Sequence, residues 1–337
     1  MIKATFKTVF LLILVVFLIL GYSYYTFLKA PINIKGEQLF EVKKGDSVNA
    51  IIERLVEKGF LNNRYFFKFM VKLKGGDRTI LHGYYLLKQD DTPETIWTKF
   101  IKGEVERYKI TIPEGYNIYQ IGEVIENQKM GSKQRFVALA KDKKFIKELG
   151  LNLPVLEGYL FPATYFFDPV TKEEDMIKEM VSKTFDVLYK ELKIPQNDKR
   201  YDIHKILTLA SLVEKEAKVK EELPLIAAVF LNRLRIGMKL QCDPTVIYGT
   251  KRFDGSITKA DLVANNPYNT YVRYGLPPTP IANPSKEAII SVLNPAKVDY
   301  IYFVSKNDGT HIFTNNLKAH NKAVYIYQKK KKKKGDA

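Results

Sequence analysis

The feature that most constrains this chain is an uncharged segment close to its start. Residues 8–28 carry no charged side chain, and residues 9–20 are all apolar. About 20 apolar residues in a helix are enough to cross the hydrocarbon core of a bilayer. Lys3 and Lys7 precede the segment, and positively charged residues favour the cytoplasmic side. The pattern predicts a cytoplasmic N-terminus over residues 1–7 and one transmembrane helix over residues 8–28.

A cleaved signal peptide is the alternative to a permanent anchor. Signal peptides have a shorter apolar core and end in small residues at a cleavage site. Here the apolar run is long, and the residues after it, Tyr22 to Tyr25, lack that pattern of small residues. We therefore expect an uncleaved anchor, with everything after about residue 30 outside the cytoplasm.

The remaining composition is that of a globular protein with a strong positive charge. The chain has 337 residues, of which 46% are apolar and 27% charged, and its formal net charge is +17. That balance supplies a core for two domains besides the anchor. The run from Lys329 to Lys334 indicates a basic tail over residues 329–337. The excess charge suits an anionic partner, and nucleic acid, anionic lipid and anionic cell-wall polymer all satisfy it.

The chain has a single cysteine, Cys242, and four histidines. One cysteine cannot form an intrachain disulfide, and it cannot supply a cysteine-based metal site. The histidines, at positions 82, 204, 311 and 320, show no metal-ligand spacing. We therefore expect no metal ion and no cofactor.

Residues 38–105 are predicted to form a small mixed module. The pattern indicates a strand over 39–42, a helix from Val48 behind the N-cap Ser47, a helix over 65–73, a strand over 83–87, and a helix from Pro93 behind the cap Thr92. The turn from Val42 to Val48 resembles the opening of the LysM module, a small βααβ fold that binds glycans containing N-acetylglucosamine. Strand–turn–helix units in general share this pattern, so a generic module is the alternative.

Residues 106–328 are predicted to form a larger mixed domain. The periodicity indicates helices near 117–127, 133–148, 172–193, 203–218, 222–236 and 285–293, and strands near 107–112 and 299–304. The stretch 265–295 is rich in proline, asparagine and glycine, which is typical of an ordered loop that forms a site. The predicted fold class is therefore α+β, with a transmembrane helix, a LysM-like module and a mixed α+β catalytic domain.

The segment from Leu209 to Ala217 places two carboxylates in an otherwise apolar helix. Glu214 and Glu216 lie about 200° apart around the helix, so each borders the apolar stripe from one side. Periodicity does not choose between them, and an ion pair with a neighbouring lysine is the structural alternative for either. A half-buried carboxyl group keeps its proton to higher pH, as the cleavage of a glycosidic bond requires.

Several other segments combine aromatic, polar and proline residues. They are 156–165, 229–234, 238–249, 267–271, 275–281, 302–304, 311–314 and 320–321. In this order and with these gaps, they and the glutamate segment resemble the MltG (YceG-like) family of endolytic murein transglycosylases. The resemblance covers nearly the whole chain. The family commonly has Asp, Thr and Gly where this chain has Ala163, Cys242 and Thr279.

The resemblance implies an endolytic lytic transglycosylase that cleaves MurNAc-β-1,4-GlcNAc bonds in nascent peptidoglycan glycan strands. Cleavage without water leaves 1,6-anhydro-MurNAc ends and terminates strand elongation. Glu216 matches the family's catalytic residue, which acts as acid and then as base. The residues expected to bind substrate are Glu157, Tyr159, Gln241, Asp243, Thr245, Tyr268, Asn269, Thr270 and His311, and those expected to support the site are Glu214, Asn232 and Arg233. The structural alternatives are a turn and helix cap at 243–245, loop self-bonding at 269–270 and, at 311, a structural histidine on a strand edge with its hydrogen bonds satisfied.

The resemblance also implies a location and partners. The location is the bacterial inner (cytoplasmic) membrane, crossed once, with the catalytic domain extracytoplasmic. The partners are peptidoglycan strands, that membrane, and peptidoglycan synthases of the elongation or division machinery. Nucleic acid is excluded by this topology and by the lack of a recognised motif. Two alternatives stay open, a hydrolytic muramidase and a non-catalytic scaffold that binds the wall.

Overall fold

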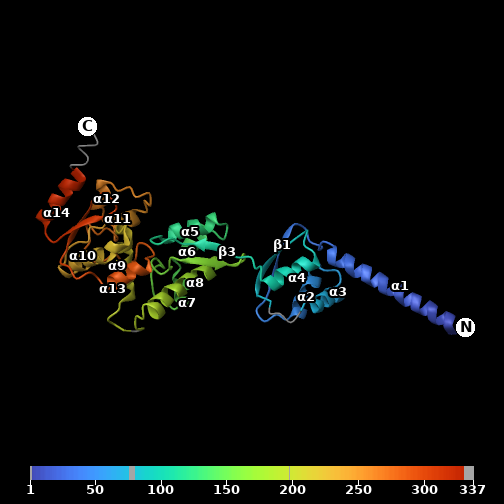
Figure 1. The fold of residues 1–337 in the computed structure, drawn as a ribbon. Coiled ribbons are helices and arrows are strands. Elements are labelled where there is room, and N and C mark those ends of the chain that lie inside the picture. The colour runs from blue at the N-terminus through green and yellow to red at the C-terminus, as the bar shows by residue number, and fades with distance from the viewer. Residues whose placement is uncertain (1, 76–79, 197, 330–337) are drawn as a thin grey trace. The chain divides into compact units, whose positions relative to one another are not determined.

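The computed structural model describes residues 2–75, 80–196 and 198–329, in two compact units that we describe separately (Figure 1). The first unit comprises residues 1–108 and 166–170, and the second comprises residues 109–165 and 171–337. Most of the predicted basic tail, from residue 330 onward, lies outside the described residues. The elements of the first 102 residues are α1 (Ile2–Lys29), β1 (Glu37–Val42), α2 (Val48–Glu57), α3 (Arg64–Leu73), β2 (Gly83–Lys88) and α4 (Pro93–Lys102).

The first unit contains a strand–helix–helix–strand sequence followed by α4. Strands β1 and β2 pair antiparallel, with Phe40 opposite Tyr85, and both side chains are fully buried. Ser47 and Thr92 cap α2 and α4 as predicted, each accepting a hydrogen bond from the backbone three residues on. The order of elements is the predicted one, whereas the LysM-like identity of the module stays a prediction.

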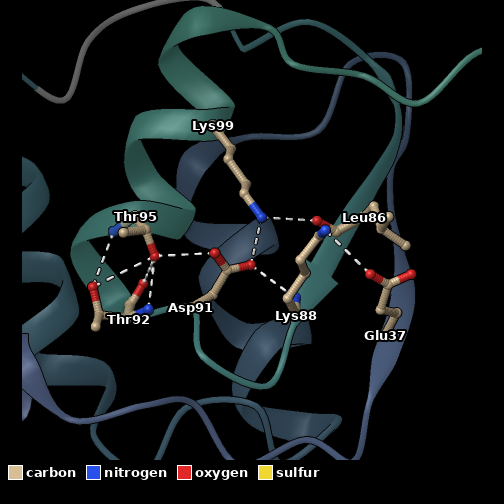
Figure 2. Close-up of polar contacts among 7 residues, drawn as sticks. All are labelled: Glu37, Leu86, Lys88, Asp91, Thr92, Thr95 and Lys99. Atoms are coloured by element: carbon tan, nitrogen blue, oxygen red, sulfur yellow. Dashed lines mark hydrogen bonds and ion pairs between the residues drawn. The ribbon is translucent and has the colours of Figure 1, made fainter.

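A buried carboxylate holds the turn between β2 and α4 (Figure 2). Asp91 accepts hydrogen bonds from the Lys88 amide at 2.8 Å and from the Thr95 hydroxyl at 3.3 Å. The Lys99 ammonium lies 2.5 Å from the same carboxylate and also donates to the carbonyl of Leu86 at 2.9 Å. Because these bonds join the strand to the helix, they fix where α4 begins.

Helix α1 contains the predicted transmembrane segment. Among the described residues, one helix is long and apolar enough to cross a bilayer, over Phe6–Lys29. Length and composition fit a single-pass anchor and also a signal sequence. Near its end, Phe27 is buried in the hydrophobic core of the first unit, so the helix is continuous with the folded part of that unit.

The second unit is mixed α and β. Two short strands, β3 (Tyr108–Thr111) and β4 (Thr164–Phe167), include the residues at which the two units divide. The other elements are α5 (Ile118–Asn127), α6 (Lys133–Leu139), α7 (Lys143–Glu148), α8 (Glu173–Asp186), η1 (Val187–Glu191), α9 (Ile203–Glu216), η2 (Lys220–Glu222), α10 (Leu223–Arg235), α11 (Asp243–Thr250), α12 (Lys259–Val263), α13 (Lys286–Leu293), β5 (Tyr302–Ser305), β6 (His311–Thr314), α14 (Leu317–Val324) and η3 (Tyr325–Lys329). Strands β5 and β6 form an antiparallel hairpin.

Helix α9 lies at the centre of this unit, packed against α10 and α13. Asp202 caps its first turn by accepting a hydrogen bond from the Lys205 amide at 3.1 Å. Of the apolar stripe read from the sequence, Ala210 and Val213 are fully buried, whereas Ile206 and Ala217 at its two ends are half-buried. This packing fixes the position of the helix end that carries the two glutamates.

Several predicted elements have different bounds. The helix predicted over 133–148 is two helices, because Asp142 caps a new helix by accepting from the Lys144 amide at 2.7 Å. The helix predicted over 203–218 ends at Glu216, since Ala217 has extended backbone with ψ of 134°. The strand predicted near 299–304 runs from Tyr302 to Ser305.

Candidate active site

Glu216 is the last residue of α9, and its side chain is half-buried. Burial raises the pKa of its carboxyl group from 4.5 to about 7, because desolvation disfavours the charged form. A hydrogen bond with the Cys242 thiol and the positive charge of Arg233 lower that pKa, and the negative charge of Asp243 raises it. The result is a carboxyl group that is present both with and without its proton near neutral pH.

A polar cleft of about 360 Å³ opens beside Glu216. Its walls come from the end of α9, from α10, from the start of α11, from the loop after α12, from the hairpin of β5 and β6, and from α14 and η3. The lining residues are Glu216, Arg233, Gln241, Asp243, Tyr271, Phe303, Val304, Ser305, His311, His320, Val324 and Gln328. The cleft therefore brings together Glu216, Arg233, Gln241, Asp243 and His311 from the set predicted by sequence.

Two of these polar groups lie at the start of α11, Asp243 as its first residue and Gln241 just before it. Asp243 accepts a hydrogen bond from the Tyr271 hydroxyl at 2.5 Å, and burial together with this bond raises the pKa of Tyr271. Gln241 has a positive φ of 49°, a conformation that non-glycine residues seldom adopt and that clusters at functional sites. The backbone amide of Gln241 donates to the carbonyl of Thr270 at 3.2 Å, and this bond joins the residues before α11 to the loop that follows α12.

Arg233 is a buried positive charge in the wall of the cleft, with 6% of its surface exposed. Its Nε donates to the carbonyl of Ile301 at 2.7 Å, and another guanidinium nitrogen donates to the carbonyl of Leu240. The guanidinium also lies over the ring of Tyr302, with 5.6 Å to the centroid. Burial lowers the pKa of Arg233, and the two carbonyls hold the guanidinium where its charge acts on Glu216.

His311 is paired with a carboxylate that sequence reasoning did not identify. Its Nδ1 lies 2.6 Å from Glu222 Oε2, and its backbone amide donates to Glu222 Oε1 at 2.8 Å. With Nδ1 engaged, the ring's other nitrogen is the one left for the cleft. The neighbouring His320 stacks on Tyr302, and its buried Nδ1 has no hydrogen-bond partner among the described residues.

Glu157 lies in a separate buried cluster. Its carboxylate is fully buried and accepts hydrogen bonds from the Ile118 amide at 3.2 Å, the Tyr248 hydroxyl at 2.9 Å and the Asn283 side chain at 3.1 Å. Burial raises its pKa to about 8. The next residue, Gly158, has φ of +85°, and a Cβ there would lie 2.4 Å from the ring of Pro280.

The other predicted substrate-binding residues do not line the cleft, and their polar groups form hydrogen bonds within the protein. The Tyr159 hydroxyl contacts the His204 ring, the Tyr268 hydroxyl contacts Thr279, and the hydroxyls of Thr245 and Thr270 contact each other. The side-chain amide of Asn269 donates to three backbone carbonyls of the 261–264 segment. Asn269 and Thr270 are therefore engaged in the loop contacts that the structural alternative described. A direct contact of these residues with substrate stays a prediction.

The two remaining supporting residues hold segments together. Glu214 accepts hydrogen bonds from the amide and the hydroxyl of Ser285, the residue that caps α13. Asn232 donates to the carbonyls of Val298 and Tyr300 at 2.9 and 3.0 Å. Glu214 and Glu216, two residues apart, thus face different surroundings, a helix cap and an open cleft.

Cys242 is the N-cap residue of α11 and is 1% exposed. Its thiol is packed in the core and forms a hydrogen bond with the Glu216 carboxylate. Burial raises the pKa of the thiol well above its ordinary value. Tyr271, Ser305, His320 and Gln328 also line the cleft without having been predicted. Tyr271 and His320 lie in or beside segments singled out by sequence, and that proximity is the signal that was available.

A half-buried carboxyl group whose pKa is raised to about 7, beside a polar cleft, is the arrangement that acid–base enzymes use. The chain belongs to the YceG-like family, whose sequence profile matches residues 40–325. It is 36% identical over 322 residues to the endolytic murein transglycosylase of Bacillus subtilis (strain 168), covering 91% of this chain and 87% of that protein. These names identify the chain as a lytic transglycosylase enzyme.

Two further proteins extend the comparison. The endolytic murein transglycosylase of Streptococcus pneumoniae (strain R6) is 32% identical over 341 residues, covering 90% of this chain and 61% of that protein. The crystal structure of a yceG-like protein from Listeria monocytogenes matches with a TM-score of 0.58 and 34% identity, covering 86% of this chain and 99% of that one. The resemblance read from the sequence is therefore confirmed at the level of the family.

Proposed function

We propose that this chain cleaves MurNAc-β-1,4-GlcNAc bonds within peptidoglycan glycan strands, with Glu216 as the catalytic residue and 1,6-anhydro-MurNAc ends as the product. The observation that carries the proposal is the half-buried Glu216 carboxyl group, with a pKa of about 7, at the side of the cleft. The names of the relatives from B. subtilis and S. pneumoniae supply the substrate class.

In the first step Glu216 donates its proton to the glycosidic oxygen, and the bond between that oxygen and C1 of MurNAc breaks. GlcNAc leaves with a new hydroxyl group, and positive charge develops at C1. The Glu216 carboxylate then takes the proton of the MurNAc C6 hydroxyl while that oxygen bonds to C1. The ring closes as the 1,6-anhydro sugar, and Glu216 returns to its protonated form without the addition of water.

The charges around the cleft support this sequence of steps. Asp243 is a second carboxylate in the lining, and it supplies negative charge for the positive C1 of the transition state. Arg233 favours the ionised form of Glu216 that the second step needs. Gln241 and His311 offer polar groups for the sugar hydroxyl and acetamido groups, and with Asp243 they are the proposed substrate-binding residues that line the cleft.

The remaining chain has proposed roles in location and binding. Helix α1 is proposed to anchor the protein in the bacterial cytoplasmic membrane, with its N-terminus in the cytoplasm and the catalytic residues outside. Residues 38–105 are proposed as a LysM-like glycan-binding module, and residues 106–328 as the catalytic domain. Peptidoglycan synthases are the proposed protein partners, because termination of a nascent strand takes place where strands are made.

Mass spectrometry of the released glycan fragments tests the chemistry. The full chain in detergent is incubated with purified peptidoglycan beside two variants, Glu216→Gln and the control Glu221→Gln, which alters an exposed carboxylate nearby. We expect the wild type and the control to release fragments with anhydro-MurNAc ends, which are lighter by one water than reducing ends. The Glu216→Gln protein should release none, because an amide does not donate a labile proton.

Three results would contradict the proposal in different ways. Reducing ends would show that the enzyme is a muramidase that uses water. Binding to peptidoglycan without release by the wild type would favour the wall-binding scaffold. Wild-type activity in Glu216→Gln would show that another group is the acid.

A further inference from the structure

Helix α3 of the first unit carries an exposed apolar face. Tyr65, Phe69 and Leu73 are 68%, 52% and 65% exposed. They are spaced four residues apart, so they lie along one side of the helix. The opposite side, with Phe67, Met70 and Val71, is buried in the core of the unit. We call Tyr65, Phe69 and Leu73 the α3 face.

Helix α3 contacts the last turns of the apolar helix α1, within the same unit. The Phe69 ring is 5.3 Å from that of Tyr24, and the Phe66 ring is 5.6 Å from it, both in edge-on contacts. Phe27, one turn further along α1, is buried in the core. The last turns of α1 and helix α3 are thus packed together.

This packing fixes the depth of the α3 face relative to a bilayer that α1 crosses. The predicted transmembrane span, residues 8–28, ends four residues, or about 6 Å along the helix axis, beyond Tyr24. The interfacial layer on each side of the hydrocarbon core is about 5–7 Å thick. Tyr24 and the Phe69 ring in contact with it therefore lie close to the inner edge of that layer.

We propose that the α3 face lies in the headgroup layer of the membrane and holds the first unit against the bilayer surface. The proposal rests on the anchoring role of α1 given under the proposed function. It does not depend on the chemistry assigned to Glu216.

The side chains present have the chemistry of this layer. Tyrosine rings favour the membrane interface because one end is apolar and the other is polar, and Tyr22 and Tyr25 on α1 are 71% and 60% exposed at the same level as the α3 face. Lys72 is exposed on α3 between Phe69 and Leu73, where its ammonium can reach lipid phosphate. In water these rings would leave a contiguous apolar surface exposed, which marks an interaction site.

Tryptophan fluorescence in vesicles of phosphatidylcholine and phosphatidylglycerol tests the proposal. The full chain is reconstituted with Phe69→Trp, and lipids brominated near the carbonyl end of their acyl chains serve as the quencher. The native Trp97 is 1% exposed and contributes the same background to every variant, so the wild type corrects for it.

Leu81→Trp is the matched control. Leu81 is 43% exposed and lies against Gly103, which follows the last residue of α4. The other end of α4 is the one near α1, because Glu94 pairs with Lys29. The control therefore lies about 14 Å along α4 from the Glu94–Lys29 pair at the end of α1.

We expect the brominated lipid to remove roughly half of the Phe69→Trp emission and to leave the Leu81→Trp emission almost unchanged, as for a residue in the interface and one in water. Thermal unfolding and flotation with the vesicles show that each variant is folded and inserted. Equal emission of Phe69→Trp with and without brominated lipid, in protein that floats, would overturn the proposal and leave the anchor in place. Failure to float would overturn both, and glycan release by the same samples reports separately on Glu216.

Discussion

Replacing Cys242 with alanine should raise the pH at which cleavage declines. The Cys242 thiol is 1% exposed, and it donates a hydrogen bond to the Glu216 carboxylate. This bond favours the charged form of Glu216 and lowers its pKa. Without it the pKa rises, so the protonated acid that starts the reaction persists to higher pH.

The size of the effect follows from the strength of that bond. A thiol is a weak donor, so its bond contributes about 0.5–1 kcal/mol, at the low end for a neutral hydrogen bond. A pKa change of one corresponds to about 1.4 kcal/mol, which gives a rise of about 0.4–0.7. The midpoint of the wild type is expected near pH 7, and above it the rate falls with the protonated fraction of Glu216. In that range, with each rate divided by the same protein's plateau rate, Cys242→Ala should be about threefold faster than the wild type.

The assay is the initial rate of glycan release measured from acidic to alkaline pH for the wild type, Cys242→Ala and Cys242→Ser. Serine keeps a donor at the same place and is the matched control, so its midpoint should stay at or below that of the wild type. The comparison uses midpoints because the cavity left by alanine also changes the absolute rate. A midpoint in Cys242→Ala that is unmoved or lower would refute the reasoning, as would an equal rise in Cys242→Ser.

Three further predictions concern contacts elsewhere in the chain. Glu222→Gln should lower kcat by about one order of magnitude, because a charge-assisted bond to His311 worth about 1.5–3 kcal/mol is weakened; an unchanged kcat in glycan-release kinetics would show that the pair is structural only. Gly158→Ala should lower the free energy of unfolding by more than about 2 kcal/mol, since its φ is +85° and Pro280 occupies the space of a Cβ; urea unfolding measures this, and Gly150→Ala, with φ of +77° and no atom within 4 Å, separates backbone strain from the clash. Asp91→Ala should destabilise the first unit by about 3 kcal/mol, because Lys99 loses its carboxylate partner. Amide hydrogen exchange should then become faster in the first unit, and faster exchange in the second unit alone would contradict this.

Local sequence signals predicted the order of elements in the first unit and two of its helix caps well. A polar cap followed by apolar residues at helical spacing determines a helix start by short-range hydrogen bonds, as at Ser47 and Thr92. The break between α6 and α7 was missed because the apolar spacing continues across it. The Asp142 cap that divides them is a single polar residue on an exposed stretch.

The candidate site was predictable only in part. The family resemblance selected Glu216 over Glu214, and the helical spacing alone did not. The structure supplies the physical difference, since Glu214 is bonded to Ser285 while Glu216 faces the cleft. The pairing of His311 with Glu222 joins residues 89 positions apart, and no periodic pattern encodes such a contact. Tyr271 is recognisable as a cleft residue only once α11 places Asp243 against it.

The wide spacing of the cleft residues along the chain has a consequence for biosynthesis. The lining begins at Glu216 and is completed only by the β5–β6 hairpin, α14 and Gln328. A growing chain that has been made as far as Glu216 therefore still lacks most of these walls, and the cleft is complete only when the chain has reached η3.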